Sequence, residues 1–253
     1  GGVGVVTEMS ALNRAQCQKV ANFQAVTGAP AKLAAEFLKR YSWSLDQAVD
    51  TFFTEGSSRT TPKLDNKKLD AFFRKYKAPG EDLVESQGIE DLCADLGVSV
   101  LDPVTLVISY HCRAERMGVF TRDELLGGMQ RLGCDDIQKL RGKLDELRSM
   151  LSDRMTCKEI YAFTFQFALD QGQRCLPVEM CVEFWKLLLR EHFALLDTWL
   201  AFVELKVKNA ISKDTWLMLY DLATQVKPDL SDYDISGAWP VLLDEFVEYV
   251  RSM

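Results

Sequence analysis

The sequence predicts an all-α protein made of a small N-terminal bundle and a larger multi-helical domain. Apolar residues recur at the spacing of an amphipathic helix along almost the whole chain. No alternating apolar and polar run bounded by turn residues predicts a hairpin. With 253 residues, 47% apolar and 26% charged, the chain can bury a core large enough for both domains.

The N-terminal part predicts a three-helix bundle within residues 9–54. Residues 1–8 carry no helical period and precede Met9, so they are treated as a tail or cloning remnant outside the fold. Helices are expected at 12–26, 31–41 and 44–54. The polar segment 55–63 cannot pack, which is typical of a linker.

The second domain is expected to span residues 64–253. Its breaks are Pro79-Gly80, Asp102-Pro103, Gly118, Gly133, Gly172, Pro228 and Gly237. The predicted helices are 65–76, 86–96, 104–116, 121–132, 135–150, 157–170, 177–192, 195–209, 212–226 and 239–251. So many helices in one chain segment predict a compact helical domain.

Hydropathy, cysteine content and charge indicate where in the cell the protein resides and which partners it has. No stretch has the roughly 18 to 20 apolar residues that span a bilayer, and the N-terminus lacks the order of a signal peptide. The seven scattered cysteines are typical of reduced thiols. A net charge of −7 argues against a nucleic-acid partner, which requires a basic face. We therefore expect a soluble protein of the cytoplasm or nucleus, without a membrane or nucleic-acid partner.

Acidic residues gather near the C-terminus. Residues 212–250 contain eight acids against Lys213 and Lys227, whereas residues 9–54 contain five basic and three acidic residues. An acidic surface attracts a basic protein partner.

The sequence offers little for catalysis. His111 and His192 are the only histidines, and neither has metal-ligand spacing to a partner. Cys175 and Cys181 are not in a CxxC arrangement, and no basic neighbours mark an activated thiol. A glycine-rich phosphate loop is also missing. We expect no catalytic residue, no metal and no cofactor.

Residues 113–124 keep the spacing of a calcium-binding loop without its ligands. An EF-hand loop has glycine at position six and glutamate at position twelve, which Gly118 and Glu124 match. Positions one and five, where calcium needs oxygen donors, hold Arg113 and Met117. The spacing predicts an EF-hand-like helix-loop-helix element without calcium, with coincidence as the alternative.

Several strings resemble the defective-in-cullin-neddylation family. They are Gly133-Cys134-Asp135 with Ile137, Lys139 and Leu140, the segments 161–167 and 213–216, and the run from Tyr233-Asp234 through Gly237-Ala-Trp-Pro-Val-Leu-Leu-Asp-Glu-Phe-Val247. The resemblance extends from about residue 10 to 251, because the N-terminal bundle is similar to the ubiquitin-associated domain of some members. It implies a potentiating-neddylation domain with EF-hand-like elements that lack calcium.

The resemblance implies a non-catalytic, scaffold-type ligase component that promotes cullin neddylation. Such a protein holds the C-terminal winged-helix region of a cullin and the cullin's RING partner near a Nedd8 conjugating enzyme, which raises the effective concentration of the reacting groups. The implied cullin-binding residues are Asp214, Ala238 and Asp244. A charged helix face that is merely solvated is the other explanation.

The resemblance also implies an apolar pocket for the acetylated N-terminal methionine of the conjugating enzyme. Acetylation removes an ammonium group that would be costly to desolvate. The matching positions are Ile89, Ile108, Met117, Gly118, Phe120, Phe167, Phe184 and Leu187. Alternatively, these residues only fill a core.

For the N-terminal bundle, the resemblance implies ubiquitin binding through Val26, Thr27 and Gly28, with a stabilising or docking role as the alternative. Two other classes stay open for the whole protein. One is an EF-hand-like protein-binding signalling module without enzymatic role, against which Arg113 and Met117 argue. The other is a cysteine-dependent transferase that carries the modifier as a thioester, which the unmarked cysteines do not favour.

Overall fold

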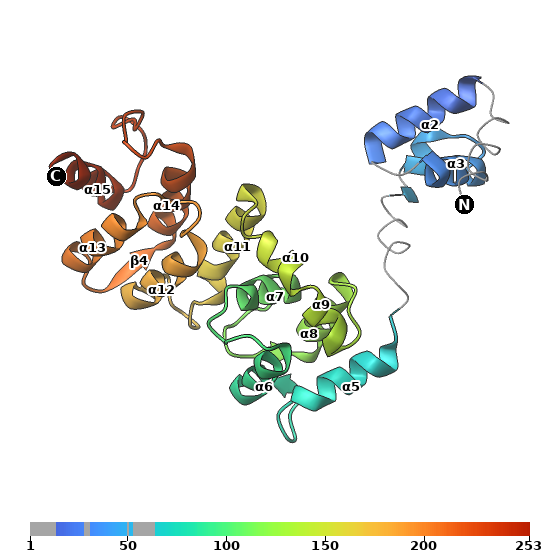
Figure 1. Ribbon diagram of the computed structural model, residues 1–253, viewed down its shortest axis with the longest axis horizontal. Coiled ribbons are helices and arrows are strands. Elements are labelled where there is room, and N and C mark those ends of the chain that lie inside the picture. The colour runs from blue at the N-terminus through green and yellow to red at the C-terminus, as the bar shows by residue number, and fades with distance from the viewer. Residues whose placement is uncertain (1–13, 28–30, 50, 53–63) are drawn as a thin grey trace. The chain divides into compact units, whose positions relative to one another are not determined.

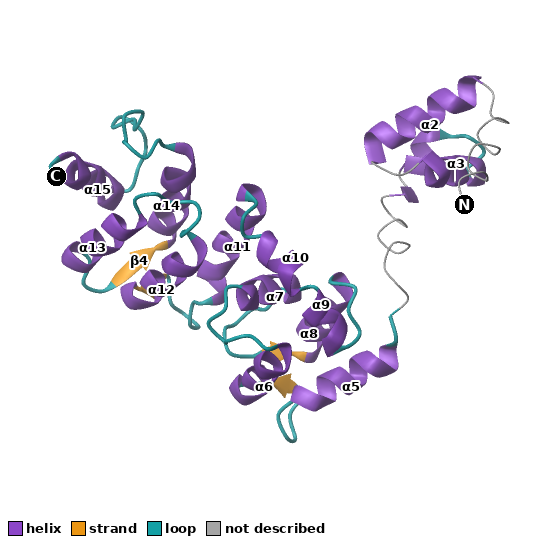
Figure 2. Cartoon of the chain, viewed as in Figure 1, coloured by secondary structure: helices purple, strands orange, loops and turns teal. Residues whose placement is uncertain are grey.

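The computed structural model describes residues 14–27, 31–49, 51–52 and 64–253. The chain divides into two compact units, of which the first ends at Lys63 and the second begins at Leu64. The predicted tail and the predicted linker lie outside the described residues. Helices dominate both units and the strands are short (Figure 2), so the predicted all-α class is confirmed. In the described ranges, every helix is too short or too polar to pass through a bilayer.

The N-terminal unit packs its helices around aromatic side chains. It contains α2 (Arg14–Thr27) and α3 (Ala31–Arg40), and residues 45–49 and 51–52 are also helical. The rings of Phe23 and Phe37 both meet Phe52 edge-on, at 5.3 Å between centroids. Because these rings come from three different helical segments, burying them holds the bundle together. The buried set is Val20, Phe23, Ala34, Phe37, Leu38 and Ala48.

The second unit consists of helices connected by short strands and turns (Figure 1). In chain order its elements are α5 (Asn66–Tyr76), β1 (Leu83–Val84), α6 (Ser86–Leu96), α7 (Val104–Cys112), β2 (Phe120–Thr121), α8 (Arg122–Arg131), α9 (Ile137–Gly142), α10 (Leu144–Ser149), α11 (Arg154–Phe167), β3 (Cys175–Pro177), α12 (Val178–Leu188), α13 (Leu196–Lys206), β4 (Ala210–Ser212), α14 (Lys213–Gln225) and α15 (Val241–Arg251).

Each pair of short strands joins two helix-loop-helix elements. β1 pairs antiparallel with β2, with Val84 opposite Phe120, and β3 pairs with β4, with Leu176 opposite Ile211. Each strand lies between two helices, so α5 to α8 form one group and α11 to α14 the other. α11 contacts α14 within its own group and α7 of the first group, so it connects the two groups of helices (Figure 1).

Three sequence-based expectations about elements were wrong. The helix predicted at 135–150 is two helices, α9 and α10, because the weak helix former Gly142 ends the first. The helix predicted at 104–116 ends at Cys112, since Arg113 turns left-handed at φ 54° and its N–H bonds the carbonyls of Ser109 and Tyr110. The strands were missed because two or three residues are too few to show alternation.

A hydrogen-bonded aromatic cluster fixes three helices of the second unit. The Trp185 indole N–H donates to the Tyr161 hydroxyl at 2.9 Å, and that hydroxyl donates to the Trp216 carbonyl at 2.9 Å. In return, the Trp216 indole N–H donates to the Tyr161 carbonyl at 3.0 Å, and the two rings stack at 4.4 Å. All three side chains are fully buried, so each polar atom finds its partner inside this cluster. It therefore joins α11, α12 and α14.

We expect Tyr161→Phe to lower the free energy of unfolding by about 1 to 3 kcal/mol, because the buried Trp185 N–H and Trp216 carbonyl lose a partner while the ring stays. Urea denaturation measures the loss. Tyr249→Phe is the matched control, since Tyr249 packs on Phe202 and its hydroxyl makes no hydrogen bond to the described residues. Equal midpoints for the two variants would contradict the prediction.

Candidate functional site

An apolar pocket of about 320 Å³ opens on the second unit between α6, α7 and the loop before β2. All eight residues predicted for a peptide pocket line it, although they span residues 89 to 187 and six different elements or loops. These residues are Ile89, Ile108, Met117, Gly118, Phe120, Phe167, Phe184 and Leu187. The structure brings them together, and their role in binding stays a prediction.

The pocket has a rigid base and an exposed edge. Ile108, Phe120, Phe167 and Phe184 are buried, and Phe184 meets the core ring of Trp216 edge-on at 6.4 Å. Met117, at the edge, is 48% exposed. Its backbone N–H donates to the Phe167 carbonyl at 3.0 Å, which fastens the loop before β2 to the end of α11. The base therefore depends on the aromatic cluster, while the edge is available to a ligand.

Gly118 keeps one side of the pocket open. It has φ +82°, a conformation that favours glycine. A Cβ placed there would meet only the Ser86 hydroxyl, at 3.8 Å, so the missing side chain leaves room over the pocket. This position widens the opening and lets a ligand approach the backbone.

Sequence reasoning missed part of the lining. Val100 and Leu101 lie between α6 and α7 and are 48% and 73% exposed, which is unusual for neighbouring apolar residues. An apolar pair directly before Asp102-Pro103, at a predicted helix break, was the available signal. The other missed residues come from α6 and α7: Ser86, Glu90, Leu92, Cys93, Leu96, Thr105, Leu106 and Ser109.

Glu124 holds the loop beside the pocket without a metal. One carboxylate oxygen accepts the Glu115 N–H at 2.8 Å, and the other accepts the Thr121 N–H at 2.7 Å and the Thr121 hydroxyl at 2.8 Å. The Thr121 hydroxyl accepts the Glu124 N–H in return, which completes a capping box at the start of α8. The carboxylate that would chelate calcium in an EF-hand is thus already bonded to protein donors.

The predicted acidic residues lie on two helices that contact each other. Asp214 is exposed in the first turn of α14, and Asp244 is half-buried in the first turn of α15. Ala238 is exposed in the loop before α15. The neighbouring apolar side chains of Ile235 and Val241 are 68% and 72% exposed. Exposed apolar side chains therefore lie near Ala238 and Asp244 in the chain.

Tyr233 orients Asp244, which the sequence did not indicate. Its hydroxyl donates to Asp244 Oδ1 at 2.6 Å, and its ring stacks on Trp239 at 5.1 Å. Burial and the neighbouring Asp244 carboxylate raise the pKa of Tyr233 above its ordinary value, so the hydroxyl stays a donor. Asp244 Oδ2 makes no hydrogen bond or ion pair to the described residues.

The predicted ubiquitin contacts are only partly described. Val26 is 58% exposed, whereas the Thr27 hydroxyl is occupied by a hydrogen bond to the Phe23 carbonyl at 2.7 Å. Gly28 lies outside the described residues. Ubiquitin binding by this unit stays a prediction.

Side chains that could ligate a metal, the two histidines among them, do not cluster in the described part of the chain. No group of three or more His, Cys, Asp and Glu residues there is arranged to hold a metal ion. His192 is bonded to the Leu151 carbonyl at 2.6 Å, and His111 lies 3.4 Å from the Met150 sulfur. Both histidines therefore contact the turn after α10.

Known families match both units. A family described as cullin binding matches residues 139–249, and a UBA-like domain matches residues 18–59. The first match includes Asp214, Ala238 and Asp244, and it also includes three of the pocket residues, Phe167, Phe184 and Leu187. These matches define a class of helical proteins that join a UBA-like domain to a cullin-binding domain.

Relatives identify the family more closely. The chain is 39% identical to DCN1-like protein 4 of Drosophila melanogaster, over 78% of this chain and 82% of that protein. It is 34% identical to defective in cullin neddylation protein 1 of Yarrowia lipolytica, over 93% and 97%, and 40% identical to human DCN1-like protein 5, over 74% and 78%. The chain belongs to the defective-in-cullin-neddylation family, which confirms the resemblance found in the sequence.

We expect Glu124→Gln to lower the free energy of unfolding by about 1 to 2 kcal/mol, because an amide offers one acceptor oxygen where the carboxylate offers two. Added calcium should leave the melting temperature of the unaltered protein unchanged. Glu146→Gln, on the exposed face of α10, is the control. A calcium-dependent rise in melting temperature would contradict this account of the loop.

Proposed function

We propose that the protein is a non-catalytic scaffold in cullin neddylation, which bridges a Nedd8 conjugating enzyme and a complex of a cullin with its RING partner. Membership of the family and the cullin-binding match support the role in neddylation. Holding donor and acceptor together accelerates transfer by raising their effective concentration, without a catalytic residue in the scaffold.

The pocket is the observation that carries the conjugating-enzyme half of the proposal. Its size and apolar lining suit one large unbranched side chain such as methionine. A free N-terminal ammonium that entered the buried base would lose water without gaining a carboxylate partner there, because Glu90, the carboxylate of the lining, is exposed. Acetylation removes that charge, so the pocket favours an acetylated N-terminus.

The acidic surface supports the cullin half. Asp214 and Asp244 would pair with basic side chains of the cullin's winged-helix region, and the small Ala238 permits close approach. Because Tyr233 occupies one oxygen of Asp244, the carboxylate is held in one orientation with its other oxygen available to a cation. A preoriented carboxylate loses less side-chain entropy on binding than a mobile one.

A thioester-carrying transferase is less consistent with the cysteines. Five of the described cysteines are buried, and burial raises the pKa of the Cys112 and Cys181 thiols to about 12. Thiols with such pKa values are protonated at neutral pH and are poor nucleophiles. Among the six cysteines whose side chains the structure describes, Cys175 alone is exposed, and it lies at the start of β3, outside the pocket lining.

We expect an acetylated N-terminal peptide of the conjugating enzyme to bind about tenfold more tightly, or better, than its unacetylated form, because the free ammonium must be desolvated. Calorimetric titration measures both affinities. Ile89→Asp, which adds a charge to the pocket wall, should abolish binding of the acetylated peptide, whereas Leu205→Asp on the exposed side of α13 should not. Equal or absent binding of both peptides to the unaltered protein would remove this half of the proposal.

We expect Asp244→Lys to slow stimulated Nedd8 transfer to a cullin by about tenfold or more, since it places like charges opposite each other. The rate of transfer in a reconstituted reaction is the measurement. Glu248→Lys changes the charge equally, one turn later on α15, and should retain most of the stimulation. Similar loss in both variants would show that general acidity, rather than Asp244, is what the cullin recognises.

A further inference from the structure

The segment between α6 and α7 carries the exposed apolar pair at the mouth of the pocket. We call residues 98–102 the rim segment. It begins after Gly97, which ends α6 at φ +77°, and it carries Val100 and Leu101 into the pocket lining. Two large apolar side chains exposed to water are unfavourable unless something holds or covers them. The position of the rim segment therefore needs a physical cause.

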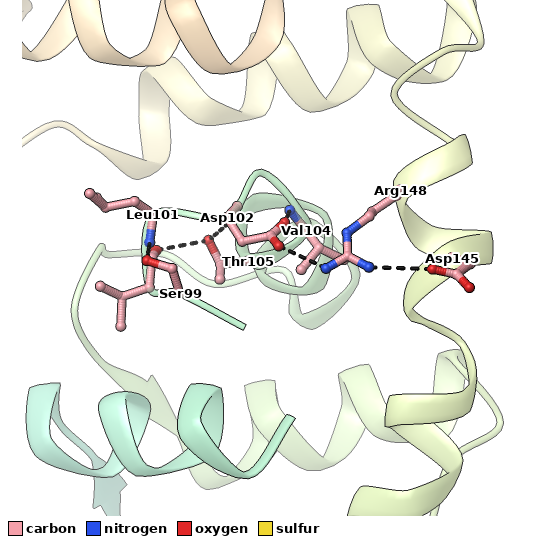
Figure 3. Close-up of polar contacts among 8 residues, drawn as sticks. Ser99, Leu101, Asp102, Val104, Thr105, Asp145 and Arg148 are labelled. Atoms are coloured by element: carbon pink, nitrogen blue, oxygen red, sulfur yellow. Dashed lines mark hydrogen bonds and ion pairs between the residues drawn. The ribbon is translucent and has the colours of Figure 1, made fainter. Parts of the chain in front are cut away.

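Local hydrogen bonds shape the rim segment (Figure 3). Ser99 accepts the Leu101 N–H through its hydroxyl at 3.2 Å and the Asp102 N–H through its carbonyl at 3.0 Å. The Thr105 hydroxyl lies 2.8 Å from the Asp102 carbonyl and 3.3 Å from that of Val100. These bonds fold the segment onto the first turn of α7, but they all lie within a few residues of one another.

Arg148 ties this folded segment to a distant helix. One oxygen of Asp102 accepts the Val104 N–H at 2.9 Å, and the other pairs with the Arg148 guanidinium at 2.8 Å. Arg148 lies on α10, 46 positions later in the chain, and Asp145 holds its other nitrogen at 3.3 Å. Figure 3 shows the guanidinium between the two carboxylates. Asp102 thus connects α7, the rim segment and α10.

The charge state of Asp102 suits this connection. Burial opposes ionisation of its carboxyl group, but the Arg148 guanidinium and the Val104 N–H outweigh burial and hold its pKa below the ordinary value. Asp102 is therefore ionised at neutral pH. The Asp102 side chain is 19% exposed and that of Arg148 is 42% exposed, so the pair is partly shielded from water and is screened by salt only in part.

We propose that Arg148 is a positioning residue for the pocket: through Asp102 it holds Val100 and Leu101 as a fixed lip against which the seated N-terminal residue of the conjugating enzyme packs. This inference rests on the proposed function of the pocket. Arg148 is not part of the pocket lining, so its effect on binding is indirect. Without it, the lip samples other positions, and binding must then order it at an entropic cost.

The test is the affinity of the full chain for the acetylated N-terminal peptide, measured for a set of variants. Arg148→Met keeps the length of the side chain and removes the charge, and we expect it to weaken binding about five- to tenfold. Arg190→Met removes a more exposed pair with the same 2.8 Å separation, between Arg190 in the loop after α12 and Asp197 in the first turn of α13, and should leave affinity unchanged. Arg148→Lys retains a cation for Asp102 and should restore most of the affinity.

Two further measurements distinguish a loss of positioning in Arg148→Met from a general loss of its stability. In about 1 M salt, the difference in affinity between Arg148→Met and the unaltered protein should shrink only in part, because the screening length of roughly 3 Å is close to the 2.8 Å separation of the pair and the pair is partly shielded from water. In the transfer reaction, Arg148→Met should raise the KM for the conjugating enzyme and leave kcat unchanged, because a high enzyme concentration orders the lip. A merely misfolded variant would instead lower kcat.

The outcomes distinguish this inference from the proposal on which it rests. If the unaltered protein fails to bind the acetylated peptide, the pocket assignment itself is wrong. If the unaltered protein binds and Arg148→Met binds equally well, or Arg190→Met loses as much affinity, the positioning role of Arg148 is wrong while the pocket stands.

Discussion

The reciprocal hydrogen bonds among Tyr161, Trp185 and Trp216 are the constraint on which both candidate surfaces depend. The cluster fixes α11, α12 and α14 against each other with every polar atom paired. α11 ends at Phe167 and α12 carries Phe184, so the cluster sets the base of the pocket. α14 carries Asp214 in its first turn, so the same cluster also positions this residue of the acidic surface. One buried network thus contributes to the geometry of both candidate surfaces.

Helical periodicity was enough to predict the fold class and most helices, because long amphipathic segments carry a strong signal. It failed where one residue changes the backbone, as at Arg113, whose left-handed conformation ends α7 early. It also failed for the strands, since their pairing joins residues far apart, such as Val84 and Phe120. Local pattern cannot show contacts that only the tertiary structure creates.

Part of the candidate site could be predicted from the sequence, but the residues that position it could not. Eight pocket residues were found through family resemblance, and the structure places all of them around one pocket. The rim segment was missed because the ion pair at its end joins Asp102 to Arg148, which lies 46 residues later in the chain. Tyr233 was missed for the same reason: its bond to Asp244 crosses a loop of irregular structure. Residues that position other residues cannot be recognised from a single sequence, because their contacts exist only in the folded structure.

Glu124 has a consequence for when the protein can act. In calcium sensors, the ion opens a helix pair and thereby exposes the binding groove. Here the Glu124 carboxylate is bonded to the N–H groups of Glu115 and Thr121, and Thr121 lies directly before α8 and next to the pocket residue Phe120. The wall of the pocket is therefore built in permanently. Under the proposed function, occupancy of the pocket would follow the concentration and N-terminal acetylation of the partner rather than a calcium signal.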